Sequence, residues 1–123
     1  MSNQHLGRIG EQSVRKYLEG KGWRFVAQNV RVGHDEIDLI MMDGSTLVFV
    51  EVKLRKPGVS GAEAVNYAKR GRISRAAVVY MTKTGGLERA ARFDVAEVAF
   101  DGVNMEIHHI ADAFPLSRGR YFV

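Results

Sequence analysis

Residues 36–53 have the sequence EIDLIMMDGSTLVFVEVK, and they predict a β-hairpin. The two apolar runs on either side of Asp43-Gly44 are typical of strands, and an Asp-Gly pair between such runs is typical of a hairpin turn. Side chains alternate between the two faces of a strand, so Glu51 and Lys53 share one face of the second strand. An acid and an amine therefore follow a run that is otherwise typical of a buried strand.

The length of the turn decides where Asp38 lies relative to Glu51. If the loop comprises residues 43–46, Asp38 lies directly opposite Glu51. If the turn is only Asp43-Gly44, Asp38 lies opposite Phe49 and still on the Glu51 face. A slip of one residue would put the two acids on opposite faces, and it is the less favoured register.

An acid pair of this kind is typical of a cation site. Directly paired side chains in a sheet are about 5 Å apart at Cβ, and two carboxylates that close repel each other unless a proton or a cation lies between them. Hard divalent ions prefer oxygen ligands, so Asp38 and Glu51 predict a Mg²⁺ or Mn²⁺ site. A single charged residue at a strand end is more often a solvated surface residue. The combination of these residues favours a functional site over that explanation.

A third carboxylate, Glu11, comes from the predicted helix over residues 4–19. Glu11 lies one turn before Val14 and two turns before Leu18, on or beside the apolar face. A carboxylate there is costly unless it is paired or bound. Two alternatives remain open: Glu11 belongs to the acidic site, or it forms a salt bridge with a Lys or Arg at the edge of the core. Gly7 and Gly10 on the same side would allow close backbone approach.

The rest of the chain predicts a scaffold around the hairpin. A strand is expected over residues 22–30, and a helix from Gly61 to about Thr82. Gly71 would mark a break in that helix, and residues 78–81 could alternatively begin a strand. A second hairpin, over residues 92–100 and 103–110, would complete the sheet. His108 and His109 are adjacent on this hairpin, so they should point to opposite faces and not share a metal ion.

Composition excludes several classes of protein. The chain has 123 residues, enough for one domain spanning residues 1–123 with a single core. It has no cysteine, which excludes disulfides and cysteine-ligated zinc and is compatible with a reducing cytoplasm. No apolar run is long enough to span a bilayer, and no signal-peptide pattern is present. The expectation is a cytoplasmic protein with no membrane association.

The balance of charge favours a polyanionic partner. The formal net charge is +4, the sequence pI is about 9.6, and basic residues follow the acidic motif. For each of them alone a solvated position is the commoner explanation, but as a group they predict contacts with nucleic-acid phosphates, whose affinity falls with salt. The candidates are Arg55, Lys56, Lys69 and Arg72.

Several motifs resemble the YraN family, also called UPF0102. They are Gly10-Glu11, residues 35–40 (DEIDLI), residues 49–55 (FVEVKLR), Ala64-Val65 with Lys69, residues 92–94 (RFD) and Ala113-Phe114. They occur in the order of the family and cover nearly the whole chain. That family in turn resembles the PD-(D/E)xK nuclease superfamily, and within it the archaeal Holliday junction resolvases.

The resemblance implies a fold and a set of roles. The fold would be α/β, with a restriction-endonuclease-like core in which helices flank a mixed central sheet in the order αβββαβ. Asp38 and Glu51 would be the metal ligands, with the Val52 carbonyl as another. Lys53 would orient the attacking water or stabilise charge, Glu11 would be the acid of the first helix, and Lys69 the basic residue of the second. Asp35 stands where the family usually has glycine, which adds charge beside the site.

The sequence therefore predicts a metal-dependent nuclease that acts on DNA phosphodiesters, with branched DNA as one candidate substrate. A homodimer would be expected for symmetric double cuts, because two cuts need two sites. The alternatives are a non-catalytic nucleic-acid-binding module that keeps the nuclease fold, and a small adaptor that binds another protein.

Overall fold

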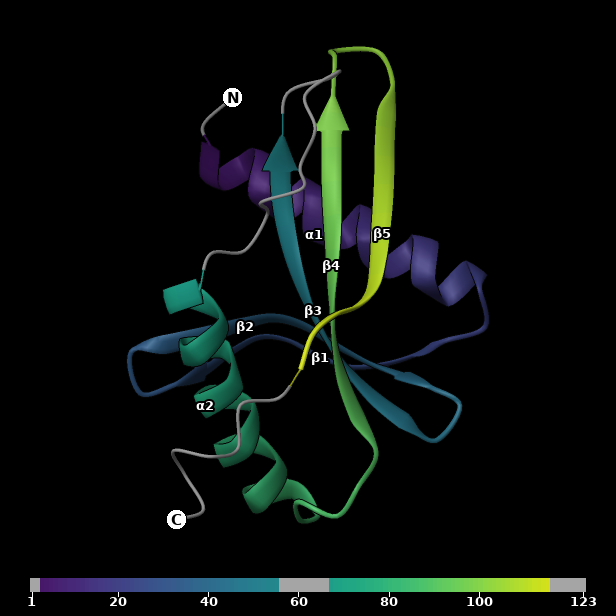
Figure 1. The fold of residues 1–123 in the computed structure, drawn as a ribbon. Coiled ribbons are helices and arrows are strands. Elements are labelled where there is room, and N and C mark those ends of the chain that lie inside the picture. The colour runs from purple at the N-terminus through teal and green to yellow at the C-terminus, as the bar shows by residue number, and fades with distance from the viewer. Residues whose placement is uncertain (1–2, 56–66, 116–123) are drawn as a thin grey trace.

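The structure is a computed structural model that describes residues 3–55 and 67–115, and these residues form two helices and five strands (Figure 1). In chain order the elements are α1 (Asn3–Gly20), β1 (Arg24–Val32), β2 (Asp35–Asp43), β3 (Thr46–Arg55), α2 (Tyr67–Thr84), β4 (Ala91–Phe100) and β5 (Met105–Phe114). The strands make one sheet in the order β1-β2-β3-β4-β5. Only β3 and β4 are parallel neighbours among these strands, and α2 lies in the crossover that a parallel pair requires.

The hairpin of β2 and β3 has the register in which the two acids face each other. Asp43 pairs with Thr46, and the ladder runs back to the pair of Leu39 and Val50. Gly44 takes a φ of 60° in the two-residue turn, a conformation that glycine adopts without the cost of a Cβ atom. The next position in this register places Asp38 opposite Glu51, which confirms the first of the two predicted alternatives.

The two helices cover opposite faces of the sheet. Val14 and Leu18 of α1 are fully buried and pack with Leu39, Val50 and Val98. The other core contains residues of α2 and the opposite sheet face, and its buried members include Phe49, Ile73, Ala76, Ala77, Met81, Phe93 and Phe114. Full burial of a large apolar side chain contributes about 1.5–3 kcal/mol, so both helices are held by apolar contacts with the sheet.

Close packing of α1 depends on Gly10. A Cβ atom at this position would lie 3.2 Å from Leu54 Cδ2 and 3.8 Å from Val98 Cγ2, so glycine lets the helix backbone approach β3 and β4. No atom lies within 4 Å of the corresponding position at Gly7. The expectation of close approach is therefore confirmed for Gly10 alone.

The second helix is continuous where the sequence left alternatives. It runs from Tyr67 through Gly71 to Thr84, so both the break at Gly71 and the strand over residues 78–81 are wrong. Ile73, Ala76, Ala77 and Met81 lie on one side of this helix and are buried. The expected start at Gly61 lies outside the described residues, as do Lys56, Ala64 and Val65.

The second hairpin is confirmed and is closed by a buried ionic network. Asp94 of β4 is fully buried, and it accepts hydrogen bonds from Arg92 Nε (3.0 Å), the His109 ring (Nε2, 2.7 Å) and the Asp112 backbone N–H (2.9 Å). Burial alone would raise the pKa of Asp94, but the hydrogen bonds from His109, Arg92 and Asp112 hold it below its ordinary value. His108 contacts Glu97 instead, which confirms that the two histidines diverge.

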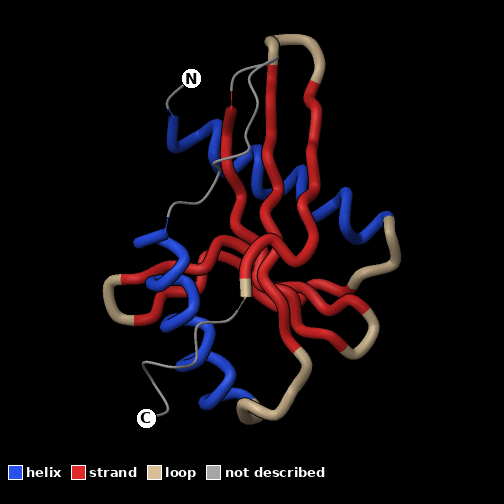
Figure 2. Tube along the Cα trace, in the orientation of Figure 1, coloured by secondary structure: helices blue, strands red, loops and turns tan. Residues whose placement is uncertain are grey.

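The sheet divides near its middle. Beyond the pair of Leu39 and Val50, β3 continues beside β4 as far as Arg55, whereas β2 continues with β1. Figure 2 shows β3, β4 and β5 extending together while the β1–β2 hairpin runs in another direction. We call this place of divergence the fork. No helix within the described ranges is long and apolar enough to cross a membrane.

Candidate active site at the fork

Where β2 and β3 diverge, the side chain of Asp38 replaces a backbone carbonyl as the acceptor of a hydrogen bond from β3. The Val52 N–H donates a hydrogen bond of 2.9 Å to Asp38 Oδ2. This N–H lies just past the last ladder pair of β2 and β3, where an unpaired buried donor would be costly. The hydrogen bond fixes the Asp38 carboxylate at the fork, beside Glu51.

The two acids predicted to face each other are in contact. Burial, reinforced by the neighbouring charges of Glu51 and Glu11 and opposed by the Val52 N–H, raises the pKa of Asp38 to about 8. Glu51 is itself only 5% exposed. Two carboxyl groups that share a buried site do not both ionise readily. Asp38 and Glu51 therefore cannot both ionise readily at the fork unless a cation lies beside them.

Lys69 supplies an ammonium group to this pair. Its Nζ forms an ion pair with Glu51 Oε1, and it comes from the first turn of α2. Together these groups line a cavity of 220 Å³ between β2, β3 and α2. The other described residues that line it are His34, Asp35, Glu36, Arg72 and Ile73.

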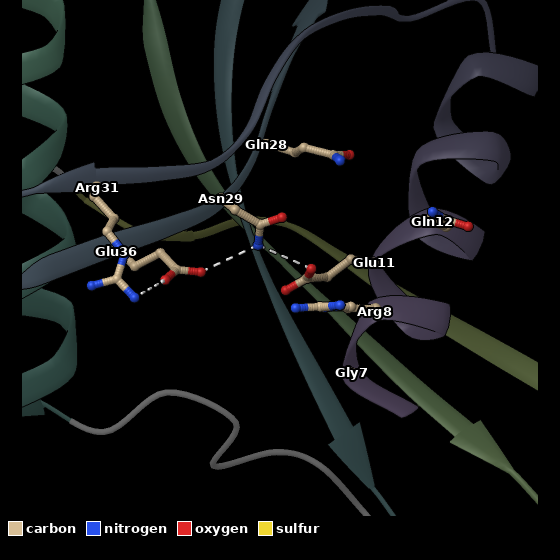
Figure 3. A pocket seen from close by; sticks show the side chains of 8 residues that line it. All are labelled: Gly7, Arg8, Glu11, Gln12, Gln28, Asn29, Arg31 and Glu36. Atoms are coloured by element: carbon tan, nitrogen blue, oxygen red, sulfur yellow. Dashed lines mark hydrogen bonds and ion pairs between the residues drawn. The ribbon is translucent and has the colours of Figure 1, made fainter. Parts of the chain in front are cut away.

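Glu11 joins the acidic group from α1. Burial raises its pKa, a hydrogen bond from Asn29 opposes this, and the charges of Glu36 and Glu51 raise it further. Asn29 Nδ2 donates to Glu11 Oε1 at 3.0 Å and to Glu36 Oε1 at 3.2 Å (Figure 3). Glu11 lines a neighbouring cavity and not the one at the fork, so its membership of the acidic site stays a prediction.

Asn29 is a residue of this site that the sequence analysis missed. It lies within β1, and its φ of 49° is in the left-handed region. Asparagine adopts that conformation more readily than other non-glycine residues. A polar residue between the apolar positions of an edge strand was the one sequence signal of this role, and it is a weak one.

Other predicted residues lie near the fork without joining its cavity. Lys53 is exposed and aligned with Glu97 of β4. The Arg55 side chain is 14% exposed, and its NH2 group lies 3.8 Å from Glu106 Oε2. The catalytic role of Lys53 and the phosphate contact of Arg55 stay predictions. Lys56 lies outside the described residues.

Asp35 binds an arginine of α2. Arg75 donates to Asp35 Oδ2 through Nε at 3.3 Å and NH2 at 3.2 Å. Asp35 therefore ties β2 to α2 at the cavity wall. Arg72, one turn earlier, lines the cavity and is exposed, so it is the arginine of this helix best placed to meet a ligand there.

Comparison with known proteins gives one consistent result. The sequence model described as "Uncharacterised protein family UPF0102" matches residues 10–98. A UPF0102 protein of Geobacter metallireducens is 40% identical over 119 residues, covering 95% of this chain and 98% of the relative. One of Halorhodospira halophila is 48% identical over 110 residues, covering 88% and 85%. One of Alkaliphilus metalliredigens is 41% identical over 114 residues, covering 91% and 99%. The matched region contains Glu11, Asp38, Glu51 and Lys69, and the chain belongs to the uncharacterised protein family UPF0102.

Proposed function

We propose that this protein is a divalent-metal-dependent nuclease that hydrolyses DNA phosphodiesters, with branched DNA as one candidate substrate. The observation that carries the proposal is the contact between the half-buried Asp38 and the buried Glu51 at the fork. The arrangement of a mixed sheet between two helices, with the acids where the sheet divides, supports a restriction-endonuclease-like core. Symmetric cutting of a four-way junction would require a dimer, because each cut needs its own site.

The donor set at the fork fits Mg²⁺ or Mn²⁺. In the described part of the chain, no group of three or more His, Asp or Glu side chains is arranged to hold a metal ion. Mg²⁺, however, is commonly bound through one or two carboxylates together with water and substrate phosphates. Asp38 and Glu51 would hold the ion, and their mutual repulsion is what a cation would relieve. A metal ion there supplies an activated water and neutralises charge on the phosphate.

Other side chains of the protein would position the metal ligands, the phosphate and the attacking water. Asp38 is held in place by the Val52 N–H. Lys69 and Arg72 bring positive charge from α2 to the same cavity, where a phosphate oxygen would need it. Glu11 adds a carboxylate from the α1 side, close enough for the charge of Glu51 to raise its pKa. Lys53 is proposed to orient the attacking water from the β3 side.

One observation favours a second candidate, a nucleic-acid-binding module without catalysis. The ion pair with Lys69 already compensates the charge of Glu51, so the fork has a cation of its own. In that case DNA would bind with a salt-sensitive affinity that is indifferent to divalent metals.

A cleavage assay separates the two candidates. Labelled linear, flapped and four-way-junction DNA would be incubated with Mg²⁺, Mn²⁺ or EDTA. The wild type would be compared with Asp38→Asn and with Glu88→Gln, a control at an exposed acid in the connection between α2 and β4. Cleavage by wild type and control, blocked by EDTA and absent from Asp38→Asn, would support the nuclease. Equal cleavage by Asp38→Asn would refute the site, and binding without cleavage under every metal would support the second candidate.

A further inference from the structure

A second polar cavity, of 560 Å³, lies between α1 and the β1–β2 hairpin. Its walls carry two arginines, three amide side chains and two glutamates, Glu11 and Glu36, so the lining suits a polar ligand and not an apolar one. Figure 3 shows Arg8 and Glu11 on α1 and Asn29 and Gln28 on β1, around the same space. The lining residues used below are Arg8, Gln12, Gln28, Asn29, Arg31 and Glu36.

This cavity adjoins the cavity at the fork. Glu36 lines both of them. Asn29 fixes that shared wall, since its amide donates to Glu36 and to Glu11 at once. A polymer with one phosphate at the fork would therefore enter the second cavity with an adjoining unit.

We propose that this second cavity is a nucleotide subsite, which binds the nucleic-acid strand on one side of the scissile phosphate through Arg8 and Arg31. The proposal rests on the proposed nucleic-acid substrate and names where that substrate lies. It goes beyond the acidic site because Arg8, Gln12, Gln28 and Arg31 line this cavity and do not line the cavity at the fork.

The positions of the two arginines suit phosphate groups. In the view of Figure 3, Arg31 and Arg8 flank the series Glu36, Asn29 and Glu11. The Arg31 side chain is 80% exposed, and its NH2 group lies 3.9 Å from Glu36 Oε2. Such a long, solvated contact contributes little, and a guanidinium has five N–H donors, so Arg31 keeps donors for a phosphate.

The amides suit the rest of a nucleotide. Gln12 and Gln28 each offer an uncharged donor and acceptor, as the edge of a base or a sugar hydroxyl requires. The volume falls within the range of about 300–1,000 Å³ that is usual for small-molecule sites. A nucleotide combines an anion with a polar ring, and both parts find a partner in this lining.

Salt dependence of DNA binding tests the proposal without requiring cleavage. Each phosphate contact contributes about 0.7–0.9 to the slope of log affinity against log salt. Arg8→Ala combined with Arg31→Ala should therefore lower that slope by about 1.4–1.8 and weaken binding roughly 25- to 60-fold at 0.1 M salt. Fluorescence anisotropy of a labelled four-way junction and a labelled single strand would be measured in EDTA over about 50–200 mM salt.

The matched control is Arg24→Ala, which removes an exposed arginine of the same strand outside the cavity. It should leave the slope and the affinity unchanged, and circular dichroism should show every variant folded. A double variant with wild-type slope and affinity would overturn the subsite, and so would an equal loss in Arg24→Ala.

The outcomes for the subsite and for the nuclease are distinguishable. If the wild type binds DNA but never cuts, and the double variant loses binding as stated, the subsite stands and the nuclease falls. If the wild type cuts DNA while the double variant binds as the wild type does, the nuclease stands and the subsite falls. A wild type that binds neither probe would overturn both.

Discussion

Replacing Asp38 by asparagine should stabilise the protein in the absence of metal, although it should abolish activity. The carboxylate repels Glu51 when both are ionised, and asparagine removes that charge. Its Oδ1 atom can still accept the hydrogen bond that Val52 N–H now donates to Asp38 at 2.9 Å. The substitution therefore isolates the charge of residue 38 from its structural contact.

The magnitude follows from the geometry of a facing pair. Two unit charges about 5 Å apart in a partly buried site interact by about 3 kcal/mol. The pKa of Asp38 is raised from 3.8 to about 8, so below pH 3.8 its carboxyl group is neutral in both the folded and unfolded states. As pH rises above 3.8, the unfolded state loses this proton first, and wild-type stability falls until the folded group ionises near pH 8.

The assay is urea denaturation followed by circular dichroism, in EDTA, from pH 4 to pH 9. Wild type and Asp38→Asn should differ by less than about 0.5 kcal/mol at the acid end. At the alkaline end the variant should be more stable by about 2–3 kcal/mol. Parallel profiles for the two proteins, or a variant that is less stable at pH 8, would refute the reasoning. Glu88→Gln serves as the control for loss of a negative charge.

Three further substitutions test other parts of the structure. Asn29→Gly keeps the left-handed backbone but removes the bridging amide. DNA cleavage should therefore fall about tenfold or more, while the midpoint of urea denaturation changes little. Unchanged cleavage would show that the bridge has no role. Lys69→Met leaves Glu51 buried without its ammonium partner. It should lower the free energy of unfolding by about 1–3 kcal/mol at pH 8 in EDTA, and by less when Mg²⁺ is added. A loss that Mg²⁺ does not reduce would contradict metal binding there. Asp94→Asn should cost about 3–5 kcal/mol by denaturation at pH 7, because it breaks a buried ionic network. The pKa of Asp94 is lowered, so this contribution is present above pH 3.8 and is lost as pH falls through the folded pKa; a variant with wild-type acid sensitivity would argue against it.

Local patterns were sufficient to predict the hairpin and its acid pair. Alternation along β2 and β3 placed Asp38 and Glu51 on one side in both weighed registers, because the strand period is two. The turn sequence favoured two registers over a one-residue slip, and the structure has the one that pairs the two acids. These predictions succeeded because each depends on neighbours in the same hairpin.

Features that depend on distant packing were not predictable in this way. A glycine inside a helix costs about 1 kcal/mol, which suggested a break at Gly71. Burial of Ile73, Ala76, Ala77 and Met81 against the sheet outweighs that cost. The contact of Lys69 with Glu51 joins a helix to a strand across 18 positions of sequence, and the conformation of Asn29 depends on groups from α1 and β2. No local periodicity encodes such contacts.

The irregularities of the outer strands have a consequence for solubility at high concentration. In the sheet formed by the described residues, β1 and β5 are the edges. Each contains a non-glycine residue with positive φ, Asn29 or Asp112, and each takes part in a pairing whose register shifts. A flat edge would offer an uninterrupted row of backbone donors and acceptors to another copy of the chain. Bulged and twisted edges interrupt that row, so we expect them to protect the protein from edge-to-edge aggregation.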